Sequence, residues 1–415
     1  MSLIRAFRGL RPAAGQASAV AAPPYDVLSS AEARERVAGK PWSFLHISKP
    51  EIDLPPDTDP YAPEVYAKAA ENLHKMLEAG VMVRDEKPCY YAYRISMPGT
   101  DGESGVHVQT GLVAAASIAD YDSNRIRKHE FTRPDKEDDR VRQIEALNAQ
   151  TGPVLLAYPA STAADELINA IAQGEPASDV TAEDGIRHQI WVLNDAAQIE
   201  AITRTFDAMP ALYIADGHHR SAAASRIAAT RHQAGQDVSA DSFLSVIFPH
   251  HQMKILDYNR VVKDLRDLEA PQLLERLGAA FKVEESTGRV HPAQPGEFGM
   301  YLAGRWYKLT IKPELIPDDP VDRLDVSLLS DRLLAPLLEV HDLRRDKRVD
   351  FVGGIRGLAE LEKRVDSGEM AVALALHATH MDQLMAVADS NNVMPPKSTW
   401  FEPKLADGLI SHMLD

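Results

Sequence analysis

The sequence contains one cysteine in 415 residues, Cys89. A single thiol cannot form an intramolecular disulfide, and it excludes a metal site built from cysteines alone. Long apolar runs are missing as well, because no stretch approaches the roughly 20 apolar residues that a membrane-spanning helix needs. Near the N-terminus, Arg5, Arg8 and Arg11 interrupt the chain before an apolar run reaches the length of a signal peptide. These absences predict a cytoplasmic protein that does not enter a membrane.

Positive charge is also in short supply. The chain carries 45 lysines and arginines against 61 aspartates and glutamates, a formal net charge of -16. Contacts to phosphates provide most of the affinity of proteins for nucleic acids, so this balance opposes such binding. We therefore expect no nucleic-acid partner and disfavour a nuclease. A local basic pocket for a small anion is compatible with the same balance, and the oligomeric state stays open.

The rest of the composition is typical of a folded protein with more than one core. Hydrophobic residues make up 45% and charged residues 26% of the chain, and 415 residues exceed what one small core usually organises. Changes in pattern predict an N-terminal α/β segment (1–105), a central core (106–265) and a C-terminal α/β segment (266–415). No internal repeat or low-complexity tract is evident.

Hydrophobic periodicity predicts helices that alternate with strands, and therefore an α/β fold (α+β, with mixed sheets). The expected helices are 63–80, 134–150 and 221–233, and the expected strands are 42–48, 90–96, 106–118, 154–158 and 211–215. We also expect a short helix capped by Ser29 or Ser30, a turn over 98–102 and a β-α-β-like stretch over 351–376.

The most informative segment is Asp216-Gly-His-His-Arg220, which follows an apolar strand and precedes an alanine-rich helix. The first N–H groups of a helix lack intrahelical partners and carry partial positive charge, so they stabilise an anion. Gly217 has no Cβ to block a phosphate, and Arg220 offers a planar fork of donors for phosphate oxygens. His218 and His219 can add donors, and Asp216 could orient one of them or hold a metal ion. We predict that this segment binds a phosphate-bearing small molecule.

A purely structural role for this segment is the alternative. An Asp-Gly turn with polar neighbours often does no more than start a helix. Two features oppose that interpretation. Arg220 in the first turn is unfavourable to the helix dipole, and two adjacent histidines are costly to keep there without a use.

A second polar group surrounds the predicted helix start at Pro134. Lys136 and Arg140 lie four positions apart, so they share one helix face and can point at one anion. Glu130, in the preceding loop with Thr132, could act as general base for a hydroxyl group. Charged helix starts are commonly just solvated, which is the alternative for this group.

Further polar residues are interpreted more simply. Tyr25, Asp26 and His46 lie where an N-terminal unit could close over the pocket. Lys397 and Lys404 flank aromatic residues in a proline-rich tail, which we interpret as a docking strap.

Several segments together resemble a known family. They are Pro23-Pro-Tyr-Asp26, His129-Glu130 with Lys136 and Asp139-Arg140, Ile214-Ala-Asp-Gly-His-His-Arg220, and Met394-Pro-Pro-Lys-Ser-Thr-Trp400. They look like a large uncharacterised prokaryotic family of about this length, and the resemblance covers nearly the whole chain. Through Asp-Gly-His-His-Arg, that family is similar to the free-serine kinases of the ParB/sulfiredoxin-like superfamily, a likeness confined to roughly residues 106–235. The resemblance implies a ParB/sulfiredoxin-like nucleotide-binding core with additional N- and C-terminal α/β elements.

The resemblance also implies roles for single residues. In that superfamily a Gly-x-x-Arg motif at a strand-to-helix junction binds nucleotide phosphates, and Gly217 and Arg220 match it. In the free-serine kinases a glutamate in a Pro-His-Glu context is the base for the serine hydroxyl. His129-Glu130 matches that context, although Lys128 stands where proline is expected. Asn259 is a second departure, since a Pro-Thr-His-Arg-like ending is expected there, and its role is in doubt.

The residues and the resemblance together suggest a kinase that moves a phosphoryl group from ATP or ADP to a small hydroxylated metabolite, with free L-serine the first candidate. The expected site comprises phosphate binding by Gly217, His218, His219 and Arg220, catalysis by Glu130, Asp216 and His218, substrate binding by Thr132, Lys136 and Arg140, and Mg²⁺ binding at Asp216. The alternative is a non-catalytic regulatory protein that keeps the nucleotide pocket as a switch.

Overall fold

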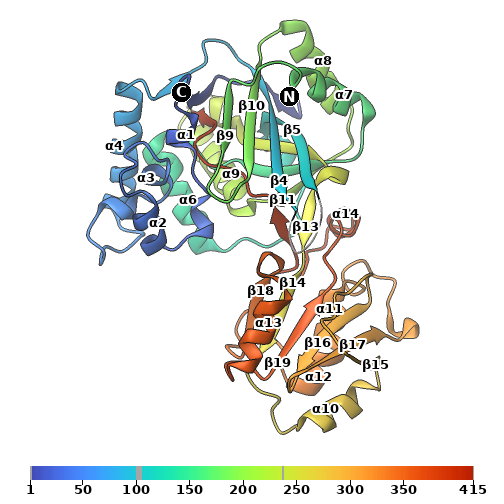
Figure 1. The fold of residues 1–415 in the computed structure, drawn as a ribbon. Helices are drawn as coiled ribbons and strands as arrows, with labels where there is room; N and C mark the ends of the chain where they lie inside the picture. The colour runs from blue at the N-terminus through green and yellow to red at the C-terminus, as the bar shows by residue number, and fades with distance from the viewer. Residues whose placement is uncertain (1, 100–104, 236–237, 415) are drawn as a thin grey trace. The chain divides into compact units, whose positions relative to one another are not determined.

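The computed structural model describes residues 2–99, 105–235 and 238–414. The chain forms two compact units, each described separately below (Figure 1). Unit 1 contains the chain up to Met253 and from Pro403 onward, and unit 2 contains Lys254–Glu402. These units do not coincide with the segments 1–105, 106–265 and 266–415, which stay a prediction. None of the helices among the described residues is both long and apolar enough to cross a bilayer.

The main sheet of unit 1 is mixed. In spatial order its strands are β6 (Ile126–Arg127), β11 (Leu212–Asp216), β8 (Val154–Tyr158), β12 (Ser242–Pro249), β5 (Val106–Ser117), β4 (Tyr90–Pro98), β10 (Arg187–Leu193) and β9 (Ser178–Thr181), and β1 (Ile4–Arg5) pairs with β5. β8 and β12 are parallel, whereas β4 and β5 are antiparallel. The expected α/β fold with mixed sheets is confirmed.

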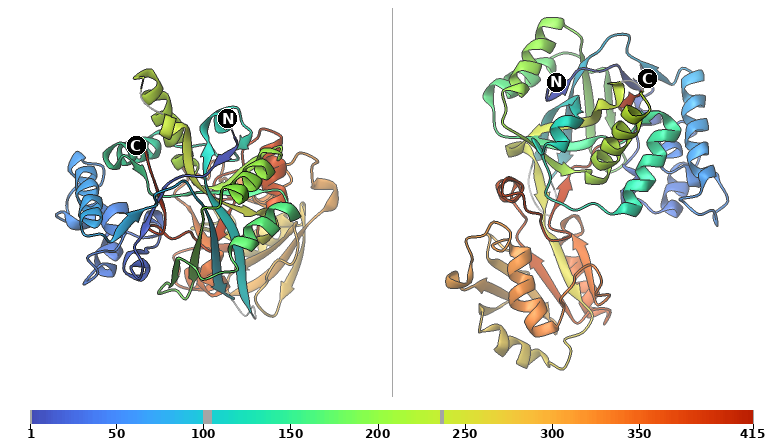
Figure 2. Two further views of the ribbon diagram at one scale, coloured as in Figure 1. Left: turned by 90° about the horizontal axis from the view of Figure 1, so that it is seen from above. Right: turned by 180° about the vertical axis from the view of Figure 1, so that it is seen from behind.

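The helices of unit 1 pack on this sheet or on other elements of the unit. They are α1 (Ala17–Val20), α2 (Ser30–Arg36), α3 (Leu45–Ser48), α4 (Pro63–Glu78), α5 (Ile118–Asp122), α6 (Pro134–Leu147), α7 (Thr162–Ile171), α8 (Ala196–Asp207) and α9 (His218–Gln233). Figure 2 shows α4, in blue, and the green helices α7 and α8 at opposite sides of unit 1. All five residues of β8 are buried, as a continuous apolar strand covered on both faces requires.

A second sheet of unit 1 depends on the end of the chain. Its order is β3 (Met82–Arg84), β2 (Gly9–Pro12), β21 (Ser411–Met413) and β7 (Ala149–Gln150). β21 lies between β2 and β7, with His412 opposite Gly9 on one side and Gln150 on the other. Residues 403–414 are therefore an interior part of unit 1, and they pass close to the site described below.

Unit 2 has its own sheet and core. The strands in order are β15 (Phe281–Ser286), β17 (Arg305–Ile311), β16 (Glu297–Leu302), β19 (Val372–Leu376), β14 (Tyr258–Val262) and β18 (Val349–Gly353). The helices are α10 (Ala270–Leu277), α11 (Asp325–Leu329), α12 (Ala335–Leu338), α13 (Gly357–Asp366) and α14 (Met381–Asp389), and β13 (Lys254–Leu256) pairs with β20 (Trp400–Glu402). β18, α13 and β19 form the expected β-α-β stretch, since both strands pair antiparallel with β14.

Most elements lie where the sequence pattern places them, with one error. Helices α4, α6 and α9 and strands β4, β5, β8 and β11 are confirmed, and Ser29 caps α2 through a capping box with Glu32. The strand expected at 42–48 is wrong, because Leu45–Ser48 is a helix. Phe44, Leu45 and Ile47 are all buried there, so a short apolar run fits a helical turn as well as a strand. The turn expected over 98–102 lies mostly outside the described residues.

Candidate functional site

The strand-to-helix junction predicted at residues 216–220 is present. β11 ends at Asp216, Gly217 adopts a left-handed conformation (φ 96°), and α9 begins at His218. A Cβ added to Gly217 would lie 3.3 Å from the Cα of Val154 and 3.5 Å from a terminal nitrogen of Arg220. Glycine is therefore favoured by the left-handed turn and by the close approach of Val154, whereas the distance to Arg220 is an ordinary contact.

A pocket of about 490 Å³, part of it open to solvent, lies beside Arg220. We call it the arginine pocket, because Arg140 from α6 and Arg220 from α9 both line it. The lining residues are Tyr25, Ser48, Arg140, Gln143, Ile144, Ala149, Gln150, Thr151, Gly152, Val154, Arg220, Phe243, Leu244 and Asp407. Gly217, His218 and His219 are not among them, so phosphate binding by the helix start stays a prediction.

Arg220 is buried and held from two sides. One terminal nitrogen donates to the carbonyl oxygen of Pro153 at 2.6 Å, and the other lies 3.5 Å from Oδ2 of Asp26. Gly152 leaves room for the chain, since a Cβ there would lie 3.4 Å from Cδ of Arg220. Burial opposes the charge of Arg220, but Asp26 and further acidic neighbours raise its pKa. The guanidinium is therefore a fixed positive charge beside the cavity.

Arg140 is the second positive charge of the pocket. Its Nε and one terminal nitrogen donate to Oδ2 of Asp139 at 3.0 and 2.6 Å, and Oδ1 of Asp139 accepts from Tyr66 at 2.8 Å. The guanidinium carbon lies 4.0 Å from the ring centroid of Tyr25, which also lies 5.8 Å from that of Arg220. Burial and the charge of Arg220 lower the pKa of Arg140, but Tyr25 and Asp139 raise it overall.

Two lining residues complete the pocket and were missed by sequence reasoning. Ser48, at the end of α3, is buried, and its Oγ has no hydrogen-bond partner within the described part of the chain. Asp407, from the C-terminal segment, is only 3% exposed. The tail residue Lys404, interpreted as part of a docking strap, lies with its Nζ 3.6 Å from Oδ2 of Asp216. No local pattern marks these residues, because long-range packing brings them together.

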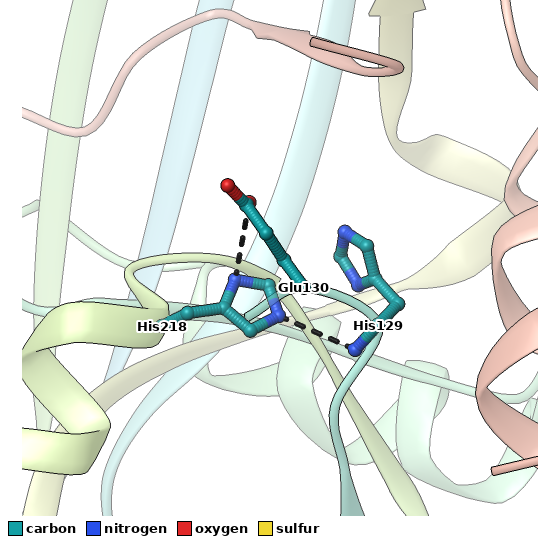
Figure 3. Close-up of side chains that lie close together, drawn as sticks. All are labelled: His129, Glu130 and His218. Carbon is teal, nitrogen blue, oxygen red and sulfur yellow. Dashed lines mark hydrogen bonds and ion pairs between the residues drawn. The ribbon is translucent and has the colours of Figure 1, made fainter. Parts of the chain in front are cut away.

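His129, Glu130 and His218 form a separate group, which we call the histidine cluster (Figure 3). Nδ1 of His218 lies 3.8 Å from Oε2 of Glu130, and Nε2 of His218 accepts the backbone N–H of His129 at 3.4 Å. Burial and the neighbouring His129 lower the pKa of His218 well below its ordinary value, and burial lowers the pKa of His129 to about 4. Both rings are therefore neutral at pH 7, whereas the Glu130 side chain is half exposed.

The structure offers two positions for a cation, with different chemistry. The ligating atoms of the histidine cluster lie within 4.8 Å of one another, and two nitrogens with one carboxylate suit Zn²⁺ or a similar ion rather than Mg²⁺. The N–H donated to Nε2 of His218 assigns the ring proton to Nδ1, which then faces Glu130 as a donor and not as a ligand. The cluster therefore fits a His-Glu contact at 3.8 Å better than a metal centre.

Asp216 is the position expected for Mg²⁺. Its Oδ1 accepts the Gly217 N–H at 2.8 Å, and its Oδ2 faces Lys404. Burial raises the pKa of Asp216, but the charges of Lys404 and Arg220 lower it overall, so the carboxylate is ionised. One carboxylate fits Mg²⁺ only if the phosphates of a bound nucleotide supply further ligands, as they commonly do.

Three other predicted residues, His219, Thr132 and Lys136, lie near these groups but do not line the arginine pocket. Nε2 of His219 accepts the backbone N–H of Arg133 at 3.0 Å, and Thr132 donates to Glu137. Lys136 donates to the hydroxyl of Tyr61 at 2.7 Å, whereas Arg140 lines the pocket. Lys136 and Arg140 therefore do not converge on one visible cavity, and the roles predicted for these residues stay predictions.

Comparisons with known proteins place the chain in a family. No curated protein matches the sequence. Among solved structures, a mutant free serine kinase in complex with AMP aligns with 14% identity, 72% of this chain, 92% of that chain and a TM-score of 0.35. A conserved hypothetical protein from Pyrococcus furiosus is 16% identical, with 71% of this chain and 94% of that chain covered and a TM-score of 0.34. C-terminally truncated SbnI from Staphylococcus aureus is 10% identical, with 71% of this chain and 84% of that chain covered and a TM-score of 0.36. These distant likenesses assign no residue roles. The family model for DUF1015, described as a protein of unknown function, matches residues 4–327, and the chain therefore belongs to the DUF1015 family.

Proposed function

We propose that this protein transfers a phosphoryl group from ATP or ADP to a small hydroxylated metabolite, with free L-serine the first candidate acceptor. The observation that carries the proposal is the arginine pocket, in which Arg140 and Arg220 share one cavity. Two buried guanidinium groups repel each other, as the lowering effect of Arg220 on the pKa of Arg140 indicates. A bound anion relieves this repulsion, and phosphates suit the planar donor geometry of arginine.

A further donor supports an anion in the same pocket. Oγ of Ser48 is buried and unpartnered within the described residues, and burying a hydroxyl without a partner costs about 1–3 kcal/mol. A phosphate oxygen would accept from that hydroxyl. Each arginine also keeps N–H groups beyond those given to Asp139 and Pro153, since guanidinium carries five. The pocket therefore binds an oxyanion without losing its internal contacts.

The histidine cluster supports the choice of base. Glu130 has a half-exposed carboxylate with the neutral ring of His218 beside it at 3.8 Å. In the proposed reaction Glu130 accepts the proton of the acceptor hydroxyl, whose oxygen attacks the terminal phosphorus while the bond to the nucleotide oxygen breaks. His218 orients Glu130, and Lys136 and Thr132 contribute to acceptor binding. Mg²⁺ held by Asp216 and the phosphates would neutralise charge on the nucleotide.

The test is formation of phosphoserine. Purified full-length protein with Mg²⁺, L-serine and ATP or ADP is expected to give phosphoserine by mass spectrometry. Glu130→Gln should abolish the product and leave the dissociation constant of the nucleotide unchanged. Glu78→Gln is the matched control, because Glu78 pairs with His74 at 3.0 Å on the exposed face of α4, and it should keep full activity. No product from any nucleotide with any hydroxylated amino acid would refute the proposal.

A regulatory protein that binds nucleotide without turnover is the second candidate. It is favoured by one observation, that neither Glu130 nor His218 lines the arginine pocket. Calorimetry combined with a turnover assay separates the candidates. A regulator binds nucleotide tightly and consumes almost none, whereas a kinase consumes it in proportion to the acceptor supplied.

A further inference from the structure

Asp407 brings a carboxyl group into a pocket dominated by arginines. It lies beyond residues 4–327, the part matched by the family model, yet its main chain is fixed within unit 1. The N–H of Asp407 donates to the carbonyl oxygen of Ala22 at 2.8 Å, and the N–H of Ala22 donates back at 3.1 Å. This bridge holds the side chain at the wall of the arginine pocket.

The carboxyl of Asp407 is only partly satisfied by the fold. It accepts the backbone N–H of Tyr25, while Arg220 donates to Pro153 and Arg140 donates to Asp139. Burial, with the nearby Asp26, raises the pKa of Asp407 to about 7, although Arg220 and Arg140 act in the opposite direction. Both guanidinium groups are near enough to act on this carboxyl electrostatically, but they donate their hydrogen bonds to Pro153 and Asp139. The carboxyl of Asp407 therefore keeps acceptor capacity for a ligand in the cavity.

Both signs of charge therefore face one small cavity. Guanidinium groups complement a carboxylate or phosphate, and a buried carboxylate complements an ammonium group. A ligand hydroxyl would give Asp407 one hydrogen bond but no charge to offset the cost of ionising a buried acid. An ammonium group provides both.

We propose that Asp407 binds the ammonium group of a small zwitterionic amino acid whose carboxylate is held by Arg140, which leaves Arg220 for the phosphate of the nucleotide. This inference rests on the proposed function for its setting, and it makes Asp407 a specificity-determining residue that separates amino acids from hydroxy acids. The ligand class is thus α-amino acids small enough for the cavity, with L-serine and glycine as probes. L-glycerate, which carries a hydroxyl in place of the ammonium group at the same configuration, is the discriminating comparison.

The experiment titrates the protein with L-serine, glycine and L-glycerate by calorimetry, with and without ADP. The wild type is expected to bind L-serine about tenfold or more tighter than L-glycerate. Asp407→Asn should lose that preference through weaker binding of L-serine, and its affinity for ADP should not fall. Retained ADP binding shows that the variant is folded. Asp407→Glu, which keeps the charge, should retain part of the preference.

Asp325→Asn in unit 2 is the matched control. Asp325 is also a buried aspartate with a pKa raised by burial to about 7, and its Oδ1 accepts a backbone N–H, that of Gly296. This variant should bind all ligands as the wild type does. A test without any variant is also available: the preference of the wild type for L-serine should grow between pH 6 and pH 8, as Asp407 ionises among Arg220, Arg140, Asp26 and Tyr25.

Three results overturn the inference: a wild type that binds neither L-serine nor glycine, one that binds L-serine no better than L-glycerate, or an Asp407→Asn variant with unchanged preference. Failure of the proposed function is distinguishable. Binding of L-serine that depends on Asp407 without any phosphoserine would reject the transfer and keep the inference. Phosphoserine formed equally by Asp407→Asn, with unchanged KM for serine, would keep the transfer and reject the inference.

Discussion

Arg140 and Arg220 are each anchored by a protein acceptor before any ligand arrives. Arg140 donates to Asp139, which Tyr66 holds in turn, and Arg220 donates to the carbonyl oxygen of Pro153. Anchored side chains lose little further rotamer freedom on binding, so more of the electrostatic attraction appears as affinity. At this scale both positive charges are held in place before the proposed anion binds.

Replacing Arg220 by lysine should weaken nucleotide binding although the charge is kept. A lysine ammonium cannot contact both Pro153 and a phosphate with the planar geometry of a guanidinium. We expect the dissociation constant of ADP, measured by calorimetry, to rise about tenfold or more. Arg226→Lys is the control, because Arg226 lies on the same helix but is half exposed and paired with Asp138 at 2.8 Å. An equal effect of both substitutions would argue against the pocket as the binding site.

The buried acid Asp325 predicts a pH dependence of stability. Burial raises its pKa to about 7, against about 3.9 in an unfolded chain. Between these values the folded protein keeps a proton that the unfolded chain has lost. The stabilisation is therefore present below about pH 4 and is lost as the pH rises through 7.

Replacing Asp325 by asparagine removes this titration and should reveal the direction of its effect on stability. In urea unfolding at pH 5 and pH 8, the free energy of unfolding of Asp325→Asn relative to the wild type should rise with pH, by roughly 2–3 kcal/mol. Asp346→Asn should show almost no trend over this range, because Arg348 keeps the pKa of Asp346 lowered despite burial and the carboxyl is then ionised in both the folded and the unfolded chain. Parallel trends for the two variants would contradict the assignment.

Sequence reasoning identified one part of the site and could not identify another. Arg140 and Arg220 were found because each belongs to a recognisable local pattern, a helix face and a strand-to-helix junction. Ser48 and Asp407 carry no such pattern, and they reach the pocket only through the packing of α3 and of the C-terminal segment. Glu130 and His218 were predicted beside the phosphate site, and the structure brings them together with each other but not into the arginine pocket.

At the scale of elements, the start of α9 depends on a glycine in two ways. Gly217 has a positive φ, and a Cβ there would approach Val154 to 3.3 Å. Gly235, just after the end of the same helix, also has a positive φ (68°), but a Cβ there meets open space. Comparing substitutions at Gly217 and Gly235 therefore separates the cost of a left-handed backbone from the cost of steric crowding.

Substitution of the two glycines should differ in cost. Gly235→Ala should destabilise the protein by about 1 kcal/mol, the strain of a left-handed residue, and Gly217→Ala by roughly 2 kcal/mol or more. Urea unfolding monitored by circular dichroism measures both values. Gly217→Ala should also weaken ADP binding, because crowding against Val154 would displace the start of α9, which carries Arg220. Equal costs would show that Val154 adjusts freely.

Helices and strands were predictable where the sequence has a clear hydrophobic periodicity or a continuous apolar run. The helix α4 and the buried strand β8 have long or strongly apolar patterns, and both were found within a few residues. The segment containing Phe44, Leu45 and Ile47 is too short for periodicity to separate a helix from a strand, and the prediction there was wrong. Packing of these three side chains in unit 1 determines the outcome.

At the scale of the whole molecule, the C-terminal segment is essential to unit 1. Deletion of residues 403–415 removes β21 from between β2 and β7 and exposes both edges. In hydrogen-exchange mass spectrometry, β2 and β7 should lose protection, whereas β14, β16 and β19 of unit 2 should keep theirs. Unchanged exchange of β2 and β7 would contradict the interior position of β21.

The division of the chain into units was the least predictable feature. Turn signals near residue 105 suggested a boundary, but β4 and β5 on either side of it are neighbours in one sheet. The chain returns to unit 1 at Pro403, and a strand of three residues, Ser411–Met413, pairs it with the rest of that unit. A pairing between positions so far apart leaves no local trace in the sequence.

This interrupted connectivity has a consequence during translation. The strands that flank β21 emerge early from the ribosome, and β21 follows only after residues 254–402 have been synthesised. At roughly 5–20 residues per second, that interval is on the order of ten seconds. The nascent chain must carry two unpaired strand edges for that time, and a chaperone that shields them would raise the yield of native protein.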